Sequence, residues 1–356
     1  MLRSGTYREE LRKLNDRSLP WEKLERKNIL ITGGTGLIGS CLTDALLFRN
    51  EYMDSHIGIW VLCRSRKHAE EIFGEFLERE YFHLILQDVS KPILPDLNIK
   101  MDYMIHAASK GDPKSFVTDP LGVMNANILG MHSIIEFSQR VSPEKVVYIS
   151  SGEAYGKLDL EADMAISETM TGIMDSLEVR NCYGISKRAA ETMCISAVYE
   201  YQIPICIARL CHTYGPTMME DENRVIFQFI ANAMRQEDIV LKSAGAQKRS
   251  YCYVMDAAGA LFTILLLGNA GEVYNVANEK SIITIRQLAE RLSSYAGRSV
   301  QYAQQSDTER QGNSGSMHAV LDNAKLLELG AQMDYDITSG IEQTIRILGE
   351  EEAIHE

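Results

Sequence analysis

The stretch that decides the fold runs from Asn28 to Gly39 and reads NILITGGTGLIG. Its first five residues, Asn28–Thr32, form a short apolar run rich in β-branched side chains, which is typical of a strand buried on both faces of a parallel sheet. The glycines follow at once, and a helical pattern over Ser40–Arg49 follows the glycines. Strand, glycine loop and helix in this order predict a site for the diphosphate of a dinucleotide, although a flexible glycine turn is the simpler alternative.

Each glycine of this loop has its own predicted task. Gly33 takes the tight turn, Gly36 lets the diphosphate approach the backbone, and Gly39 lets the helix pack closely on the strand. The N-terminus of the helix faces the negative charge. The predicted cofactor-binding residues of the loop are Gly33, Gly36, Leu37, Ile38 and Gly39.

Strand-like and helix-like runs alternate beyond this loop, which predicts a doubly wound α/β fold with a parallel sheet. The further strand-like runs are Ile59–Leu62, Leu84–Gln87, Tyr103–His106, Val146–Ser150 and Ile205–Leu210, with helical patterns at Val123–Gln139 and Ser186–Tyr201. After Pro216 the alternation loosens into the helical patterns 224–235, 285–296 and 321–329 and the strand-like runs 251–254 and 273–276.

These patterns divide the chain into three predicted parts. Residues 1–25 form a charged N-terminal extension with one short helix that Pro20 ends. Residues 26–215 form the dinucleotide-binding domain, to which 251–280 return. Residues 216–250 and 281–350 form a smaller C-terminal α/β lobe for the substrate.

Charge and composition exclude several kinds of partner. The 356 residues carry 36 Lys and Arg against 49 Asp and Glu, and the formal net charge of −13 argues against nucleic-acid binding. The longest apolar stretch, 257–267, is too short for the ~20 residues that span a bilayer, and the N-terminus lacks the apolar core of a signal peptide. Seven cysteines without CxxC pairs favour reduced thiols over disulfides or a zinc cluster. We therefore expect a soluble cytoplasmic protein with no metal and no membrane partner.

The end of the second strand bears on the choice of cofactor. An acidic residue there would bind the adenosine ribose of NAD, whereas basic residues could accept the 2′-phosphate of NADP. The chain has Cys63-Arg64-Ser65-Arg66-Lys67 at this point. Arg64 is predicted to contact the cofactor, but its guanidinium could equally lie flat on the adenine, so the choice stays open. A solvated helix start with scattered charge is the alternative.

Tyr183 and Lys187, in the run YGISK, are the predicted oxidising pair. A spacing of four places both side chains on one face of a helix. The neighbouring ammonium favours the phenolate and is expected to bring the tyrosine pKa down from about 10 toward working pH. Such a tyrosine takes a proton from a hydroxyl while hydride leaves the same carbon for nicotinamide. A pair of surface residues on a helix is the alternative.

Ser151 and Glu153 follow the fifth strand-like run, in SSGEAYG. Reacting groups gather beyond the carboxyl ends of strands in open parallel sheets, which is where this segment falls. Ser151 is predicted to hydrogen-bond the reacting oxygen, and Glu153 to act as a base on a carbon acidified by an adjacent ketone. A serine-rich turn and a solvated loop carboxylate are the alternatives.

Taken in order, these motifs resemble the extended short-chain dehydrogenase/reductase family, and more narrowly its nucleotide-sugar epimerases and dehydratases. The resemblance covers nearly the whole chain, residues 26 to 345. The motifs that carry it are TGGTGLIG (32–39), Asp88-Val89, His106-Ala107-Ala108-Ser109, Asn127, SSGEAYG (150–156), YGISK (183–187) and Arg209…Tyr214-Gly215-Pro216.

The resemblance implies a Rossmann-type domain that holds NAD tightly, with NADP as the alternative. Asp88 would contact the adenine amino group, Ala107 would lie near the cofactor ribose, and Lys187 would bind the nicotinamide ribose as well as the tyrosine. The cofactor-binding residues implied beyond the glycine loop are Arg64, Asp88, Val89, Ala107, Ala108 and Lys187.

The C-terminal lobe of such enzymes binds a nucleoside-diphosphate sugar, and its sequence here is similar to UDP-glucuronate decarboxylases and dTDP-glucose 4,6-dehydratases. Arg224 and Arg249 fall on family positions that bind the diphosphate, although a surface ion pair is the alternative for each. His212 stands where these relatives usually carry Asn, so the diphosphate or sugar contact is expected to differ. The family also commonly forms homodimers through two helices per subunit, here 123–139 and 186–201.

A second departure bears on the reaction. Gly152 stands where the dehydratases carry the aspartic acid that protonates the departing hydroxyl, and where the decarboxylases carry a hydroxyl. Glycine cannot donate that proton, which argues against 4,6-dehydration unless water or another residue substitutes, and the hydroxyl of the decarboxylases is missing as well. Simple 4-epimerases usually lack the glutamate, so Glu153 argues against them.

The leading hypothesis is a redox-neutral sugar-nucleotide enzyme. It oxidises C4 to a ketone, lets dehydration, decarboxylation or epimerisation follow, and returns the hydride. An NADPH-dependent reductase of a 4-keto-sugar nucleotide is one alternative, and a dinucleotide-binding module without chemistry is the other. The retained set of Ser151, Tyr183 and Lys187 argues against the last of these.

Overall fold

The computed structural model describes residues 4–93, 99–160, 164–218, 222–312 and 318–355. Its centre is a seven-stranded sheet in the order β10-β6-β5-β4-β1-β2-β3, in which every neighbouring pair runs parallel. The strands are β1 (Asn28–Thr32), β2 (Gly58–Cys63), β3 (Phe82–Leu86), β4 (Tyr103–His106), β5 (Lys145–Ser151), β6 (Ile205–Leu210) and β10 (Val273–Val276). The sheet is the predicted doubly wound, Rossmann-type arrangement.

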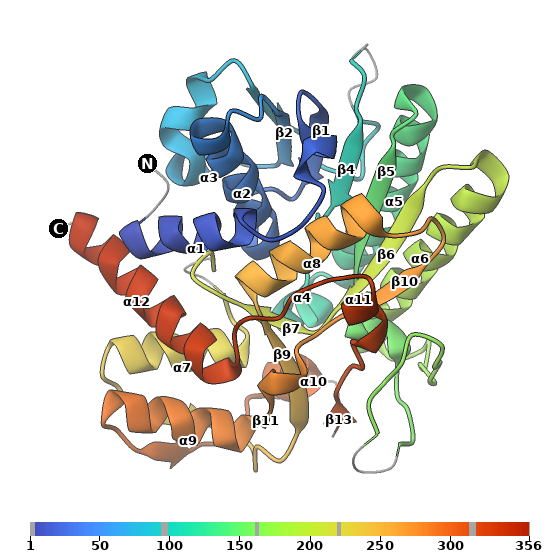
Figure 1. Cartoon of the computed structure of the whole chain (residues 1–356). Coiled ribbons are helices and arrows are strands. Elements are labelled where there is room, and N and C mark those ends of the chain that lie inside the picture. The colour runs from blue at the N-terminus through green and yellow to red at the C-terminus, as the bar shows by residue number, and fades with distance from the viewer. Residues whose placement is uncertain (1–3, 94–98, 161–163, 219–221, 313–317, 356) are drawn as a thin grey trace.

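Helices cover both faces of this sheet (Figure 1). Successive residues of a strand face opposite layers: Ile29 and Ile31 belong to the core under one set of helices, and Leu30 to the core under the other. The first layer contains α2 (Leu37–Met53) and α8 (Val254–Leu267), and the second contains α5 (Pro120–Val141) and α6 (Cys182–Tyr201). Burial on both faces explains why the strands read as continuous apolar runs.

Shorter elements connect these layers. They are η1 (Trp21–Leu24), α3 (Arg66–Phe73), η2 (Gly74–Glu78), α4 (Pro113–Thr118), η3 (Gly152–Tyr155) and η4 (Val179–Asn181). The last two lie on either side of the site described below, because η3 follows β5 directly and η4 leads into α6.

The smaller lobe forms the lower part of Figure 1. Its main sheet has the order β11-β9-β13, with β7 paired to β9, and a separate two-stranded sheet joins β12 and β8. The strands are β7 (His212–Tyr214), β8 (Ile239–Leu241), β9 (Lys248–Tyr253), β11 (Ile282–Thr284), β12 (Val300–Tyr302) and β13 (His318–Ala319). Its helical elements are α7 (Val225–Met234), η5 (Glu279–Ser281), α9 (Ile285–Ala296) and α10 (Asp307–Gly312). Of the last two helices, α11 (Ala324–Glu328) packs against β10 of the main sheet, and α12 (Ile337–His355) packs against α1, α7 and β9.

The N-terminal segment is an integral part of the fold. Helix α1 (Gly5–Asn15) packs against α2, α8 and α12, and its Tyr7, Leu11 and Leu14 are fully buried. Burying each leucine contributes roughly 1.5–3 kcal/mol. Arg17, beyond the helix, donates to the buried carboxylate of Asp256 at 2.6 Å, so the segment is fastened to the start of α8 by charge as well as by apolar contact.

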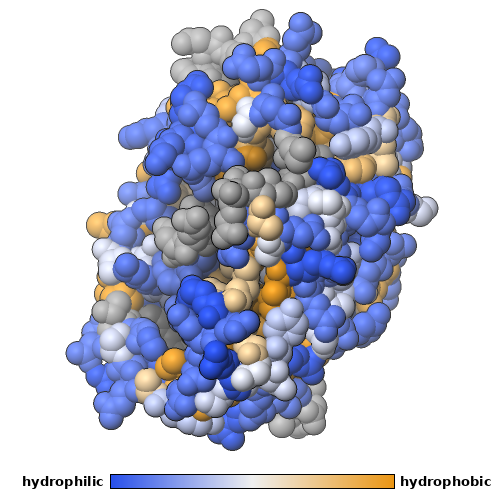
Figure 2. Space-filling model, turned by 90° about the vertical axis from the view of Figure 1, so that its left-hand side faces the viewer, coloured by the Kyte–Doolittle hydropathy of each residue, from blue (hydrophilic) through white to orange (hydrophobic). Residues whose placement is uncertain are grey.

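The face drawn in Figure 2 is mostly hydrophilic, and its apolar side chains form small areas between polar ones. This agrees with a chain in which 24% of residues are charged. In the part of the chain that the structure describes, the helices are too short or too polar to cross a bilayer.

Candidate active site

The glycine loop joins β1 to the N-terminus of α2. Gly33 has a φ of 67°, and a Cβ there would lie 2.7 Å from the Cα of Ala108, so the turn closes directly against the end of β4. A Cβ on Gly39 would lie 2.2 Å from the Gly33 carbonyl oxygen, which explains the need for glycine on the first turn of the helix. Gly36 differs, because a Cβ there would meet only this same oxygen, at 3.5 Å.

The loop therefore leaves an open cradle over Gly36, at the start of α2. The first N–H groups of a helix have no partner within it, and the helix dipole adds positive charge at the same place. A dinucleotide diphosphate fits this combination of open space and backbone donors. Leu37 and Ile38 supply the first N–H groups of α2, while the Leu37 side chain itself is buried.

The other predicted cofactor residues follow neighbouring strands at the same edge of the sheet. Arg64 follows β2, Asp88 and Val89 follow β3, and Ala107 and Ala108 follow β4. Asp88 accepts a hydrogen bond from the backbone N–H of Ser90 at 2.9 Å, and this bond, with help from Arg64, holds the pKa of its carboxyl below the usual value. Val89 is buried, so its side chain belongs to the core.

The structure brings Ser151 and Tyr183 together. Ser151 ends β5, Tyr183 stands in the first turn of α6, and the hydroxyls of Ser151 and Ser109 are near enough to the Tyr183 hydroxyl to lower its pKa. The Tyr183 ring stacks on Phe116 with centroids 4.6 Å apart and an interplanar angle of 16°. The Ser151 hydroxyl also accepts from the backbone N–H of Glu153 at 3.2 Å, which fixes the chain after β5.

The pKa of Tyr183 shifts in the direction opposite to our prediction. Burial raises it, and the nearby Ser151 hydroxyl opposes that rise without overcoming it. Lys187 lies on the same helix face, but its Nζ is 5.8 Å from the Tyr183 ring centroid and donates to the Ile149 carbonyl at 2.7 Å. Burial lowers the pKa of Lys187 itself to about 7, although Glu191 raises it. The ammonium is therefore less able to stabilise a phenolate than its spacing in the sequence indicated.

Glu153 has a partner that the sequence analysis missed. Arg180 donates to both of its carboxylate oxygens, Nη1 to Oε2 at 2.7 Å and Nη2 to Oε1 at 3.0 Å. The guanidinium carbon also lies 5.5 Å from the ring centroid of Phe116, the ring that stacks on Tyr183. Arg180 thus contacts both the predicted base and the ring that supports the predicted oxidising residue. In the sequence, its position three residues before Tyr183 was the one feature that could have placed Arg180 in the predicted site.

A second arginine–carboxylate pair lies behind the site. Arg209, near the end of β6, donates to both oxygens of Glu191 at 2.9 and 2.7 Å, and Glu191 also accepts from the hydroxyl of Ser150 at 2.6 Å. Glu191 lies one turn beyond Lys187 on α6. The pair joins β5, β6 and α6 beneath the catalytic side chains.

The predicted substrate arginines have unequal surroundings. Arg224 pairs with the carboxylate of Glu222 at 2.7 Å, and its charge lowers the pKa of Tyr183, so it lies within electrostatic reach of the tyrosine. Arg249 donates to His212 Nε2 at 2.9 Å and to the side-chain oxygen of Gln247 at 2.9 Å. His212, Arg224 and Arg249 are brought together, since both arginine charges lower the pKa of the histidine.

The space beside Gly152 is occupied mainly by Leu321. A Cβ at this position would meet the two terminal carbons of Leu321 at 3.4 and 3.5 Å and the Leu210 carbonyl oxygen at 3.7 Å. Leu321 is buried and belongs to a small cluster with Tyr155 and Ile166. A hydrocarbon side chain therefore lies where a proton donor on residue 152 would extend.

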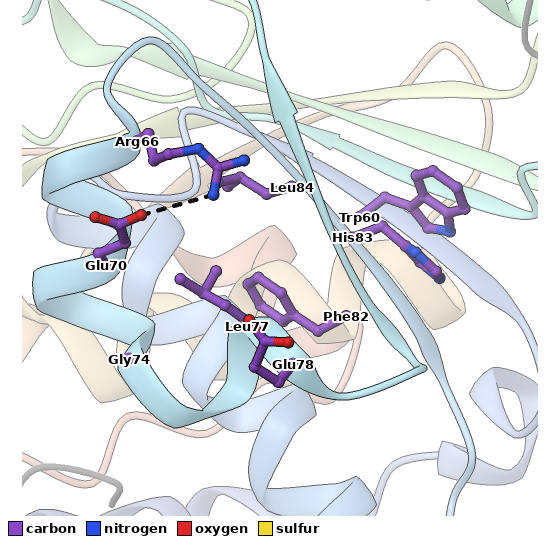
Figure 3. A pocket seen from close by; sticks show the side chains of 9 residues that line it. All are labelled: Trp60, Arg66, Glu70, Gly74, Leu77, Glu78, Phe82, His83 and Leu84. Carbon is purple, nitrogen blue, oxygen red and sulfur yellow. Dashed lines mark ion pairs between the residues drawn. The ribbon is translucent and has the colours of Figure 1, made fainter.

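A cavity of about 600 Å³ lies elsewhere, at the β3 edge of the sheet (Figure 3). Leu77, Phe82 and Leu84 are on one side of the strand in this view, and Trp60 and His83 are on the other. It shares no residue with the site above. Among the described residues, no group of three or more His, Cys, Asp and Glu side chains could hold a metal ion.

Known proteins resemble this chain over most of its length. The profile of the NAD dependent epimerase/dehydratase family matches residues 29–277. UDP-glucuronic acid decarboxylase 1 of Xenopus tropicalis is 30% identical over 329 residues, covering 92% of this chain and 73% of that protein. UDP-glucuronic acid decarboxylase 3 of Arabidopsis thaliana is 31% identical over 273 residues, covering 77% and 75%.

Solved structures share the fold. UDP-glucuronic acid 4-epimerase from Bacillus cereus, in complex with UDP-glucuronic acid and NAD, matches with a TM-score of 0.77 at 21% identity, covering 91% of this chain and 99% of that one. The dTDP-glucose 4,6-dehydratase from Bacillus anthracis, in complex with NAD, matches with a TM-score of 0.75 at 20% identity, covering 92% and 98%.

This chain belongs to the NAD-dependent epimerase/dehydratase family of extended short-chain dehydrogenases/reductases. The family is NAD-dependent, and the sequence relatives named above are nucleotide-sugar decarboxylases. The resemblance seen in the sequence motifs is thereby confirmed.

Proposed function

We propose that this chain decarboxylates a nucleoside-diphosphate hexuronate, with UDP-glucuronate as the first candidate substrate. The observation that carries the proposal is the pairing of Gly152 with Leu321 beside an intact Ser151, Tyr183 and Glu153. Dehydration needs an acid to protonate the departing hydroxyl, and the position that would supply one holds a glycine beside Leu321. Loss of carbon dioxide from a sugar with a 4-keto group needs no such acid. The decarboxylase relatives support the same choice.

Tyr183 performs the first step on the substrate. Its phenolate takes the proton of the sugar 4-hydroxyl, and the Ser151 hydroxyl holds the reacting oxygen by a hydrogen bond. The glycine loop would hold NAD, which would supply the hydride chemistry at C4. Ser151 and Arg224 both lower the pKa of Tyr183, so they favour the phenolate that burial disfavours.

The second step uses the new ketone. The bond between C5 and the carboxylate carbon breaks, its electron pair enters the enolate of the 4-ketone, and carbon dioxide leaves. C5 then takes up a proton at the Glu153 carboxylate, which Arg180 holds in place, and this proton comes from solvent. As hydride returns to C4, Tyr183 returns its proton to the 4-oxygen. The net reaction consumes one proton, releases carbon dioxide and leaves the cofactor oxidised.

We also propose that the enzyme is a cytoplasmic homodimer that pairs through α5 and α6. The two helices pack together, and they leave large apolar side chains exposed, among them Leu121, Leu129, Ile195 and Tyr199. Light scattering on the purified protein is expected to give twice the mass of the 40.0 kDa chain. Leu129→Glu is expected to halve that mass, and an unchanged dimer in this variant would place the interface elsewhere.

The activity test offers the purified enzyme UDP-glucuronate, UDP-glucose and dTDP-glucose separately and identifies products by mass spectrometry. We expect UDP-glucuronate to lose carbon dioxide, with no net change in the absorbance of reduced nicotinamide. Tyr183→Phe serves as the inactive control. A product that has lost water, or one with the mass of the substrate, would replace decarboxylation with dehydration or epimerisation.

A further inference from the structure

The arginines around the site differ in what neutralises their charge. Most of them meet a carboxylate: Arg180 pairs with Glu153, Arg209 with Glu191, and Arg224 with Glu222. Arg249 instead donates to His212 and Gln247, both neutral acceptors, and within the described ranges no carboxylate lies at ion-pair distance from it. Arg249 therefore keeps its positive charge available to a ligand.

The backbone explains why these three side chains meet. Strands β7 and β9 pair in parallel, with His212 opposite Tyr251. Side chains two residues apart on a strand share a face, so Arg249 lies on the same face as Tyr251 and His212, and Gln247 continues this row just before β9. The guanidinium is thus held from two directions, by a histidine on the neighbouring strand and by a glutamine on its own chain.

The protonation of His212 is set by its partners. Arginine can only donate, so Nε2 of His212 accepts from Arg249 and carries no proton. The backbone of Ser250 favours the protonated ring. In a neutral imidazole whose Nε2 accepts, the one proton lies on Nδ1. Burial, with the charges of Arg249 and Arg224 beside it, keeps the pKa of the imidazole well below its usual value. His212 is therefore a neutral ring whose one lone pair faces Arg249.

We propose that His212 is a positioning residue that presents Arg249, with its charge uncompensated, to an oxyanion of the substrate. Two parts of a nucleoside-diphosphate hexuronate offer the required chemistry, the diphosphate and the sugar carboxylate, and a guanidinium suits either. The inference rests on the proposed function only in requiring an anionic nucleotide-sugar substrate.

The experiment measures binding by calorimetry with UDP, UDP-glucose and UDP-glucuronate. The NAD-loaded enzyme carries Tyr183→Phe, which is expected to abolish turnover, and every further variant for calorimetry is made in this background. Because one charged hydrogen bond is lost, His212→Ala is expected to weaken binding about tenfold. Equal weakening for all three ligands assigns Arg249 to the diphosphate, and weakening for UDP-glucuronate alone assigns it to the carboxylate. Unchanged binding of all three overturns the proposal. Because no product is formed, these results stand or fall separately from decarboxylation.

Matched variants separate positioning from general damage. His212→Asn keeps a neutral acceptor and is expected to bind within about threefold of wild type. His56→Asn replaces an exposed histidine at a φ of 52°, a backbone that asparagine tolerates, and is expected to change nothing. Gln247→Ala removes the other acceptor and keeps the test available if His212→Ala does not fold. In steady state, His212→Ala is expected to raise KM with kcat within about twofold, and an equal loss in kcat would indicate a merely structural role.

Discussion

Replacing Arg180 with glutamine tests whether this arginine fixes Glu153 for the step after oxidation. The change removes two charge-assisted hydrogen bonds, of 2.7 and 3.0 Å, from a guanidinium that is 13% exposed and a carboxylate that is 31% exposed. Each such bond contributes about 1.5–3 kcal/mol when buried, and the partial exposure of Glu153 reduces the sum. If about 2.7 kcal/mol of this positioning is lost in the transition state, the later step slows about 100-fold.

The assay follows the absorbance of reduced nicotinamide after rapid mixing of the variant with UDP-glucuronate. Oxidation at C4 depends on Tyr183 and Ser151, so its rate is expected to stay within about fivefold of wild type while reduced cofactor accumulates. Glu153→Gln is expected to do the same, and the double variant to lose no more than Glu153→Gln alone, because both act through one interaction. Equal slowing of both steps, or additive losses in the double variant, would refute the reasoning.

Three further perturbations test other parts of the site. Tyr183→Phe is expected to abolish turnover while NAD still co-purifies, measured by releasing and quantifying the nucleotide; residual turnover would place the proton transfer elsewhere. Lys187→Met tests whether the pKa of Lys187 is lowered to about 7 in the folded protein. Between pH 7 and the usual value of 10.5, Lys187 is protonated in the unfolded chain but largely neutral in the folded one. The free energy of unfolding of the wild type is therefore expected to rise with pH in this range. In urea titrations at pH 7 and 9 the wild type is expected to gain about 1–2 kcal/mol relative to Lys187→Met, and parallel behaviour would contradict the shift. Gly36→Ala is expected to keep the melting temperature and bind NAD at least tenfold more weakly. Gly39→Ala places a Cβ 2.2 Å from the Gly33 oxygen and is expected to lower the melting temperature. A lower melting temperature for Gly36→Ala, with unchanged stability of Gly39→Ala, would contradict the assigned roles.

The main sheet could be predicted from the sequence because most of its strands are buried on both faces. The edge strand β3 is only partly buried, and the expected run Leu84–Gln87 is displaced from its bounds Phe82–Leu86. The expected bounds Asn28–Thr32, Tyr103–His106 and Ile205–Leu210 agree with β1, β4 and β6. The helix expected from Val123 begins at Pro120, with Asp119 accepting from the N–H of Gly122 at its start. Asp-Pro is a known helix start, so this boundary was available in the sequence and was missed.

The smaller lobe was harder to predict because its elements are short. Strand β7 has three residues and β13 has two, and both depend on pairing with β9 rather than on any apolar run of their own. A pattern method needs several residues to detect a period. The position of His212 beside Arg249 follows from this pairing and could not be seen before it.

The candidate catalytic side chains were predicted from residue type and spacing, but the direction of their pKa shifts could not be predicted in this way. The distance of four between Tyr183 and Lys187 predicted a shared helix face and said nothing about burial, which sets the pKa of both. Arg180 likewise meets Glu153 only because η3 and η4 lie on either side of the site. Local patterns identify reacting groups, whereas burial and long-range ion pairs need coordinates.

An acidic chain that binds an anionic substrate must solve an electrostatic problem, and the arrangement of its arginines solves it locally. With a net charge of −13, the surface as a whole repels a nucleotide sugar. Arginines that pair with carboxylates can hold catalytic groups in place but add little net attraction. Arg249, held by His212 and Gln247, gains its position from hydrogen bonds that leave its charge intact. Introducing a carboxylate here, as in Gln247→Glu, is therefore expected to weaken UDP binding more than Gln247→Ala does. Calorimetry with UDP compares the affinities of the two variants. If Gln247→Ala binds UDP more weakly than Gln247→Glu, the charge of Arg249 does not govern UDP binding.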